Sequence, residues 1–312
     1  MTASSARPAL SAYRGRFAPS PTGPLHFGSL VAATGSYLEA RTARGHWLVR
    51  MEDLDRPRNQ PGAAEGILAT LDALGFEWNG EVMYQSMRTD AYRAALARLQ
   101  ALGLVYPCSC SRREIHDSAI AAPDGSLVYP GTCRNGLPPG RVARAQRLRV
   151  PDEIIRFDDL TQGRIEQSLA REVGDFVLLR ADGIHAYQLA VVVDDAEQGI
   201  TDVVRGADLL DSTARQIFIQ RALGLPTPRY VHLPVAVNPE GEKLSKQTLA
   251  APVDAAHAAP ALVAALNFLG QSPPFDLARA GIRTVWQWAL ENWERGKIPR
   301  VRARPAPAVI AA

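Results

Sequence analysis

Residues 16–29 read RFAPSPTGPLHFGS, and this stretch decides the fold of the N-terminal half. Its apolar first residues are suited to the end of a strand, and three prolines then impose a tight turn. Apolar residues at helical spacing follow over residues 30–44, and Ser29 stands where a helix cap is expected. The pattern therefore predicts a strand, a tight loop and the N-terminus of a helix.

The start of this helix is suited to a phosphate group. A helix N-terminus presents unpaired backbone N–H groups and a partial positive charge. His26 and Gly28 lie just before it, so an imidazole and a bare backbone can approach the same anion. Taken alone, the His-x-Gly tripeptide is equally compatible with a buried histidine at a helix cap.

A second strand is expected at residues 47–51, and an acidic cluster that begins at Glu52 follows it directly. Strand, helix and strand form a βαβ unit, in which ligands bind at the carboxyl ends of the strands. Glu52 is therefore placed to meet a ligand. The cluster is also compatible with a solvated turn.

Arg205 ends a third apolar run, Val203-Val204, which is typical of a buried parallel strand. Its planar guanidinium suits a carboxylate, although an arginine at a strand end often forms a surface ion pair. Arg16, Glu52 and Arg205 together offer what an amino acid with two carboxylates and one ammonium needs. Asp194 and Asp195 resemble a magnesium pair, but we expect them to orient the wall of the site.

Residues 243–247 read KLSKQ, after a glycine that permits movement. Lys243 and Lys246 can neutralise the β- and γ-phosphates of a nucleotide in a transition state. A basic surface loop is the alternative for any isolated Lys-x-x-Lys.

Three cysteines indicate a metal site. Cys108 and Cys110 form a Cys-x-Cys pair, and Cys133 follows after 22 intervening residues. This set suits a tetrahedral zinc that lacks one ligand, and three unligated thiols are the alternative. The candidates for the fourth ligand are Tyr129, His116, Asp117 and water.

Length and composition indicate an α/β protein of one large or two modest domains, with 312 residues, 46% hydrophobic residues and a net charge of +3. No apolar run is long enough to span a membrane and no secretory signal is visible, so a cytoplasmic protein is expected. Further helices are expected over residues 61–74, 89–102, 212–223, 262–269 and 285–293, and strands over residues 147–150, 175–179 and 230–234. Residues 295–312 are expected to form a frayed basic tail, in which Arg300, Arg302 and Arg304 could touch phosphates.

Residues 16–29 and 243–247 resemble the two signatures of the class I aminoacyl-tRNA synthetases, in the form carried by the glutamyl branch. The resemblance implies an α/β fold with a Rossmann-type parallel-sheet catalytic domain that uses ATP and Mg²⁺. It implies catalytic roles for His26, Lys243 and Lys246, and nucleotide contacts from Gly28, Ser29 and Lys246. It implies that glutamate is held by Arg16, Ala18, Ser20, Glu52, Tyr187 and Arg205. Val191 departs from the asparagine of many full-length members.

The short members of this branch, the glutamyl-Q tRNA(Asp) synthetases, are similar in two further respects. Their zinc ligands match Cys108, Cys110, Tyr129 and Cys133, which implies one structural ion. Only 65 residues follow Gln247, too few for the anticodon-binding domain of the long enzymes. The resemblance implies activation of glutamate without tRNA and its transfer to queuosine in the anticodon of tRNA(Asp), by a monomer.

The expected organisation has five parts. They are a flexible tail (1–13), the first half of the catalytic domain (14–105), an inserted zinc-bearing subdomain of the acceptor-binding type (106–190), the second half with the lysine loop (191–250), and a short helical segment with a basic tail (251–312). Three alternatives stay open: a minimal glutamyl-tRNA synthetase that charges a tRNA 3′ end, a zinc-bearing RNA-binding module without catalysis, and a ligase for a small metabolite.

Overall fold

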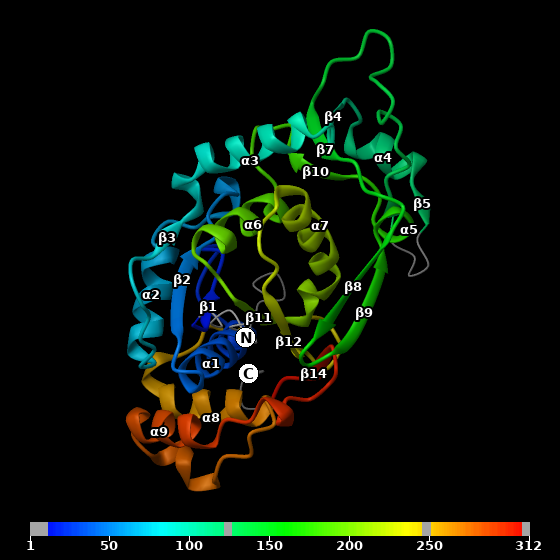
Figure 1. Cartoon of the computed structure of the whole chain (residues 1–312). Coiled ribbons are helices and arrows are strands. Elements are labelled where there is room, and N and C mark those ends of the chain that lie inside the picture. The colour runs from blue at the N-terminus through cyan, green and yellow to red at the C-terminus, as the bar shows by residue number, and fades with distance from the viewer. Residues whose placement is uncertain (1–11, 122–126, 245–250, 308–312) are drawn as a thin grey trace, which may run out of the picture.

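A computed structural model describes residues 12–121, 127–244 and 251–307 (Figure 1). Two groups of parallel strands form its centre. β1 (Arg14–Phe17), β2 (His46–Met51) and β3 (Met83–Tyr84) run parallel, and so do β11 (Asp202–Gly206) and β12 (Arg229–Leu233). Hydrogen bonds between Arg14 and Thr201 place β11 beside β1. The result is the α/β arrangement expected of a nucleotide-binding domain.

Helices cover the faces of these strands, and the two most deeply buried, at residues 27–42 and 213–223, are buried around most of their circumference. The α-helices are α1 (Phe27–Thr42), α2 (Ala63–Ala73), α3 (Thr89–Ala101), α6 (Tyr187–Glu197) and α7 (Thr213–Leu223). Short 3-10 helices are η1 (Arg56–Arg58), η2 (Gln85–Met87) and η3 (Ala207–Ser212). Aromatic rings of Tyr37, Trp47, Phe76 and Trp286 pack together and join α1 to the C-terminal helices.

The segment between β3 and α6 contains smaller sheets and short helices. β4 (Val105–Cys108), β7 (Ala145–Leu148) and β10 (Phe176–Leu179) form an antiparallel sheet, and β5 (Ile120–Ala121) pairs with β6 (Leu127–Val128). α4 (Arg112–Ser118) and α5 (Leu169–Glu172) accompany them. The hairpin of β8 (Ile154–Asp159) and β9 (Gly163–Ser168) joins the central sheet, because Asp159 pairs with Tyr230 of β12. This hairpin links the segment to the strands that form the site.

The C-terminal part holds α8 (Ala258–Phe268), α9 (Ile282–Asn292) and the 3-10 helices η4 (Ala255–His257), η5 (Phe275–Arg279) and η6 (Arg295–Lys297). α8 packs against α1 and lies at the opposite end of the molecule from α4 (Figure 1). No helix in the described residues is long and apolar enough to cross a membrane.

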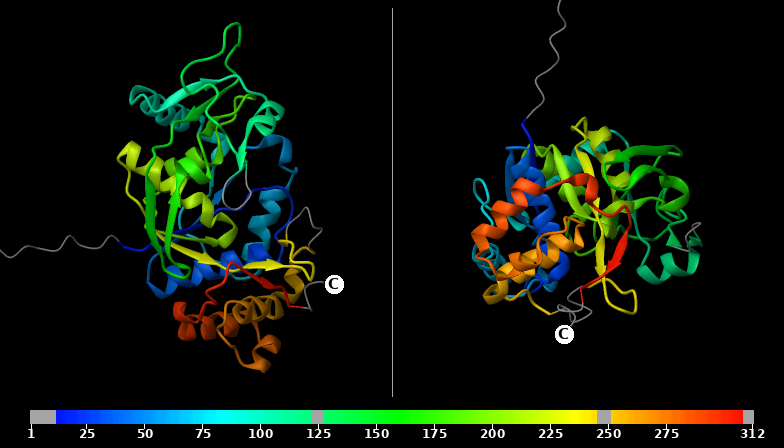
Figure 2. Two further views of the ribbon diagram at one scale, coloured as in Figure 1. Left: turned by 90° about the vertical axis from the view of Figure 1, so that its right-hand side faces the viewer. Right: turned by 90° about the horizontal axis from the view of Figure 1, so that it is seen from below.

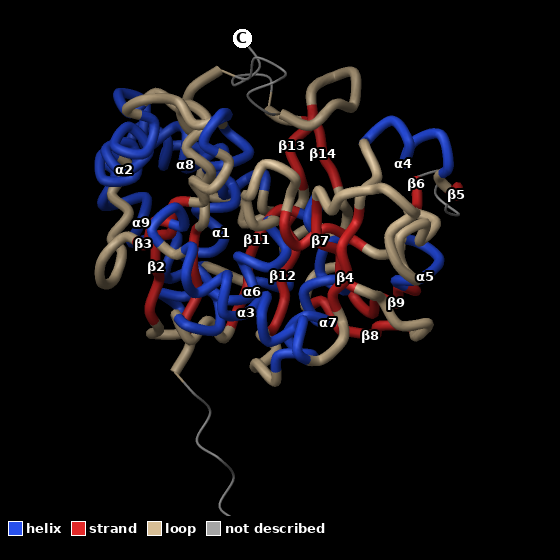
Figure 3. The backbone as a smooth tube through the Cα atoms, turned by 90° about the horizontal axis from the view of Figure 1, so that it is seen from above, coloured by secondary structure: helices blue, strands red, loops and turns tan. Residues whose placement is uncertain are grey.

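The expectation of a frayed C-terminal tail is wrong for residues 295–307. β14 (Ala303–Pro305) pairs in parallel with β13 (Val235–Val237), and the two strands lie side by side in Figures 2 and 3. The Ala306 N–H donates to the Val237 carbonyl at 2.8 Å. Arg302 pairs with Asp211 at 3.1 Å, and Arg304 donates to the carbonyl of Phe268. A strand edge far away in the sequence therefore orders this segment, and two of the three arginines contact protein groups.

Candidate active site

A cavity of about 410 Å³ opens at the carboxyl ends of β1 and β11. Its wall includes seven of the side chains singled out in the sequence, which are Ala18, Ser20, His26, Gly28, Ser29, Arg205 and Lys243. They come from the loop after β1, from the first turn of α1, from the end of β11 and from the segment after β13. Open α/β sheets bind ligands at this position, outside the carboxyl ends of their strands.

His26 caps α1, and the expectation that Ser29 is the cap is wrong. His26 has extended backbone angles, and its Nδ1 accepts a hydrogen bond from the Ser29 N–H at 3.3 Å. The Ser29 hydroxyl lies 3.2 Å from His26 Nε2. A Cβ atom at Gly28 would lie 3.1 Å from the imidazole ring, so glycine lets the ring fold over the helix start. The sequence analysis thus identified the residues at the start of the helix correctly, but the N-cap is His26 and not Ser29.

Arg205 is buried, with 5% of its surface exposed, and two of its three nitrogens are bonded. Nε donates to His232 Nε2 at 3.0 Å, and Nη2 donates to Thr213 Oγ1 at 2.9 Å. Nη1 is buried and has no hydrogen-bond partner among the described residues. Because the residue also lines the cavity, the unpaired N–H groups are available to an anionic ligand.

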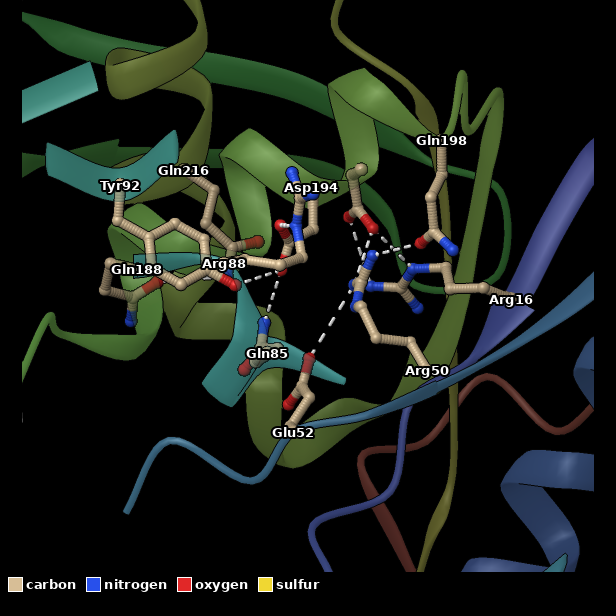
Figure 4. A network of polar contacts seen from close by, with 11 residues as sticks. Arg16, Arg50, Glu52, Gln85, Arg88, Tyr92, Gln188, Asp194, Gln198 and Gln216 are labelled. Carbon is tan, nitrogen blue, oxygen red and sulfur yellow. Dashed lines mark hydrogen bonds and ion pairs between the residues drawn. The ribbon is translucent and has the colours of Figure 1, made fainter. Parts of the chain in front are cut away.

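Glu52 follows β2 and lies beside a buried cluster of charges (Figure 4). Arg50 is fully buried, and its Nη2 is 2.7 Å from Asp195 Oδ1 and 3.7 Å from Glu52 Oε1. Burial raises the pKa of Glu52 to about 7, and the charge of Arg50 limits the rise. Glu52 is thus held beside a positive charge that is itself neutralised by Asp195.

Arg16 makes a two-pronged contact with the same carboxylate. Its Nε and Nη2 donate to the two oxygens of Asp195 at 3.0 and 3.2 Å. Burial opposes ionisation of Asp195, but the charges of Arg16 and Arg50 outweigh it and lower the pKa of Asp195. Two nitrogens of the Arg16 fork are therefore engaged by the protein, which leaves Nη1 as the nitrogen for any ligand.

Asp194 and Asp195 do not form an open metal pair. Asp194 is fully buried and accepts from Arg88 at 2.6 Å, from Tyr92 at 2.7 Å and from Gln85 at 2.8 Å (Figure 4). Carboxylates saturated by arginine, phenol and amide donors hold neighbouring elements together. None of their partners in the described residues is among those that line the cavity, so their expected role in orienting the wall of the site stays a prediction.

Tyr187 is the first residue of α6. Burial raises the pKa of its phenol, and the negative charge of Glu52 adds to the rise. The charges of Arg205 and Arg16 act on it in the opposite direction, so Tyr187 stands between the acidic and basic groups of the site. It stays a neutral hydroxyl at neutral pH, able to donate or accept a hydrogen bond.

Lys243 Nζ lies 2.5 Å from Asp208 Oδ2 at the rim of the cavity. Lys246, the second expected lysine, lies outside the described residues. The Val237–Lys243 bridge and the Leu244 N–H bond to the Ala236 carbonyl attach this segment to β13.

The cysteine cluster is compact. The sulfur atoms of Cys108, Cys110 and Cys133 lie within 4.8 Å of one another. The Tyr129 hydroxyl is 3.5 Å from the Cys108 sulfur and 3.6 Å from the Cys110 sulfur. His116 and Asp117, two other candidates for the fourth ligand, are exposed on α4 and lie outside this group. Three thiols and a phenol thus converge on one point.

Three contributors to the site were not predicted from the sequence. They are Arg50, His232 and Thr213, which contact Asp195 or Arg205. Arg50 lies two residues before Glu52, so its place in the second strand could have indicated it. The other two lie in elements whose contacts depend on the tertiary fold.

Fold and cavity together define a catalytic domain of the class I synthetase type. The family model described as "tRNA synthetases class I (E and Q), catalytic domain" matches residues 12–261. A solved glutamate tRNA ligase from Elizabethkingia meningosepticum, crystallised with its amino acid, superimposes with a TM-score of 0.77 at 26% identity. The match covers 96% of this chain and 68% of that one.

Relatives with higher sequence identity define the family within this class. A glutamyl-Q tRNA(Asp) synthetase of Dechloromonas aromatica is 65% identical over 291 residues, which cover 93% of this chain and 97% of the relative. Another from Aromatoleum aromaticum is 61% identical over 300 residues, which cover 96% of this chain and 95% of the relative. The chain belongs to the glutamyl-Q tRNA(Asp) synthetases, a family of aminoacyl-tRNA synthetase-like ligases within class I.

Proposed function

We propose that the protein activates L-glutamate with ATP, without tRNA, and transfers the glutamyl group to queuosine in the anticodon of tRNA(Asp). The names of its relatives support this proposal. The observation that carries it is the unpaired Nη1 of buried Arg205 in the wall of a cavity that also contains His26 and Gly28. A carboxylate and a nucleotide would meet in this cavity.

Glutamate would be bound by complementary charges. Arg205 is placed to take one carboxylate, and Arg16 has Nη1 left for the other. Glu52 would take the ammonium group, and Tyr187 would donate a hydrogen bond beside them. Ala18 and Ser20 would contact the substrate from the loop after β1.

ATP would lie with its phosphates over His26, Gly28 and Ser29, at the start of α1. An oxygen of the α-carboxylate attacks the α-phosphorus in line, the bond to the β-phosphate oxygen breaks, and pyrophosphate leaves. His26, Lys243 and Lys246 would stabilise the developing negative charge, and Mg²⁺ would supply further charge neutralisation to the phosphates. A hydroxyl of queuosine then attacks the carbonyl carbon, AMP leaves, and the hydroxyl proton passes to solvent.

We propose one structural zinc ion bound by Cys108, Cys110, Tyr129 and Cys133. The Cys110 and Cys133 sulfur atoms are 3.6 Å apart. Two thiolates on a tetrahedral zinc with Zn–S bonds of about 2.3 Å would be separated by about 3.8 Å, so the spacing fits. Four protein ligands leave no position open for chemistry. We expect the protein to act as a monomer in the cytoplasm.

ATP–pyrophosphate exchange tests the first half of the reaction. Exchange should require glutamate, should proceed without any tRNA, and should be much slower with aspartate or glutamine. Absence of exchange until tRNA is added would contradict the proposal and favour a minimal glutamyl-tRNA synthetase.

A further inference from the structure

We propose that Asp159 and His232 are positioning residues that fix the guanidinium of Arg205 so that only Nη1 faces a substrate carboxylate. The inference rests on the proposed role of Arg205 in binding glutamate. Neither residue was singled out in the sequence, and neither lines the cavity. Both act through Arg205, His232 by direct contact from β12 and Asp159 from β8 by its contact with His232.

The orientation of Arg205 is set on two of its three nitrogens. His232 Nε2 lies 3.0 Å from Nε, and Thr213 Oγ1 lies 2.9 Å from Nη2. A guanidinium is planar, so fixing Nε and Nη2 also fixes the direction of Nη1. The protein thereby specifies in advance where a carboxylate must sit, which lowers the entropy lost on binding.

The tautomer of His232 follows from the chemistry of its neighbour. Arg205 Nε–H can only donate, so His232 Nε2 must accept and therefore carries no proton. The proton is then on Nδ1, which lies 2.6 Å from Asp159 Oδ2 and donates to it. Burial lowers the pKa of His232 to about 4, so the ring stays neutral and keeps its acceptor toward Arg205.

Asp159 is in turn held by the backbone. Its Oδ1 accepts from the N–H groups of Gln162 at 2.8 Å, Thr161 at 3.0 Å and His232 at 3.3 Å. The side chains of Asp159 and His232 are both fully buried. Asp159 ends β8, which pairs with β12, so a residue of the segment between β3 and α6 would orient a group of the proposed glutamate site.

This arrangement makes Asp159→Asn a sharp test. Three backbone N–H groups face Oδ1, so the asparagine oxygen must take that position and its NH₂ must face His232 Nδ1. His232 would then accept at Nδ1 and carry its proton on Nε2, where it would point at the Arg205 Nε–H. Two donors would face each other, although the substitution only replaces a carboxylate oxygen by an amino group on a residue that does not line the cavity.

The experiment measures glutamate-dependent ATP–pyrophosphate exchange in five variants. Asp159→Asn and His232→Leu should each raise the KM for glutamate about tenfold to hundredfold, with the KM for ATP unchanged. His232→Gln should recover most of the wild-type KM, because Oε1 of glutamine can reach the position of Nε2. Asp159→Asn added to His232→Gln should have little further effect, because no imidazole tautomer remains to be switched.

Arg205→Ala distinguishes a failure of the positioning role of Asp159 and His232 from a failure of the proposed glutamate-binding role of Arg205. If Arg205→Ala raises the KM for glutamate while Asp159→Asn and His232→Leu do not, the positioning role is overturned. If Arg205→Ala itself has no effect, the proposed function of Arg205 fails instead. A rise in the KM for ATP equal to that for glutamate would show a general loss of structure and would also overturn the positioning role. Should Asp159→Asn fail to fold, the comparison of His232→Gln with His232→Leu decides the matter.

Discussion

If Glu52 takes the ammonium group as proposed, we expect it to couple the binding of glutamate to pH. Burial raises its pKa to about 7, and only the ionised carboxylate attracts an ammonium group. Below pH 7 the side chain gains a proton and loses its charge, so binding should weaken as pH falls. A single group with this pKa predicts that the KM for glutamate rises about tenfold from pH 8 to pH 6.

The matched variant is Glu52→Gln, which keeps the shape of the side chain but cannot ionise. Its KM for glutamate should be high at every pH, with a flat profile between pH 6 and pH 8. A wild-type profile as flat as that of the variant would show that Glu52 is not the ammonium partner.

At the scale of residues, the sequence predicted the charges of the site better than their contacts. Arg205 lies near the end of β11 and Glu52 directly follows β2, so their position at the carboxyl ends of the strands could be inferred. Asp159 and His232 are 73 residues apart, and no spacing pattern relates them. The cap of α1 shows the same limit, because histidine and serine can both accept the N–H bond and only the backbone angles of His26 distinguish them.

At the scale of elements, β14 acts as a support for β13. Val237 of β13 forms a bridge with Lys243, and β14 pairs along the edge of β13. A chain that stops after Ile298 keeps the buried Ile298 but loses β14. Its rate of adenylate formation should fall about tenfold, equivalent to roughly 1.4 kcal/mol of lost positioning, with the KM for glutamate unchanged.

The control for this truncation stops after Pro307, which keeps β14 and removes only the last five residues. It should exchange pyrophosphate at the wild-type rate. Equal rates for both truncated chains, with equal melting temperatures, would show that β14 is dispensable.

The cysteine cluster stabilises the short elements around it if it binds zinc. We expect about one zinc per chain by mass spectrometry, and Cys110→Ser should lose the ion and lower Tm by roughly 5 °C or more. His116→Ala is the matched control, because His116 is exposed on α4 and should leave the zinc content unchanged. Purified wild-type protein without zinc, at an unchanged Tm after chelation, would contradict the metal site.

The elements that the sequence predicted best carry their signal locally. α1, α3 and α7 have apolar spacing and β11 has an apolar run, so each was found within a few residues. β14 has no such signal, because alanine, proline and arginine do not favour strands and its partner lies more than sixty residues earlier. The pairing of β8 with β12 is equally invisible in the sequence.

At the scale of the whole molecule, the fold places the cavity and the cysteine-bearing segment on neighbouring strands. The cavity lies at the ends of β1 and β11, where we propose that a nucleotide and a carboxylate bind, and β8 joins the cysteine-bearing segment to β12, the neighbour of β11. The sequence indicated this organisation through its two signatures. It suggested an acceptor RNA only through the resemblance to the short enzymes.

The most direct test of the account is the transfer of labelled glutamate in the presence of ATP and total tRNA. The tRNA is prepared from a strain that makes queuosine and from one that does not, and nuclease digestion then locates the label. We predict label only in the queuosine-containing pool, on the modified nucleoside of tRNA(Asp). Equal labelling of both pools, or label on the 3′-terminal adenosine, would contradict the account.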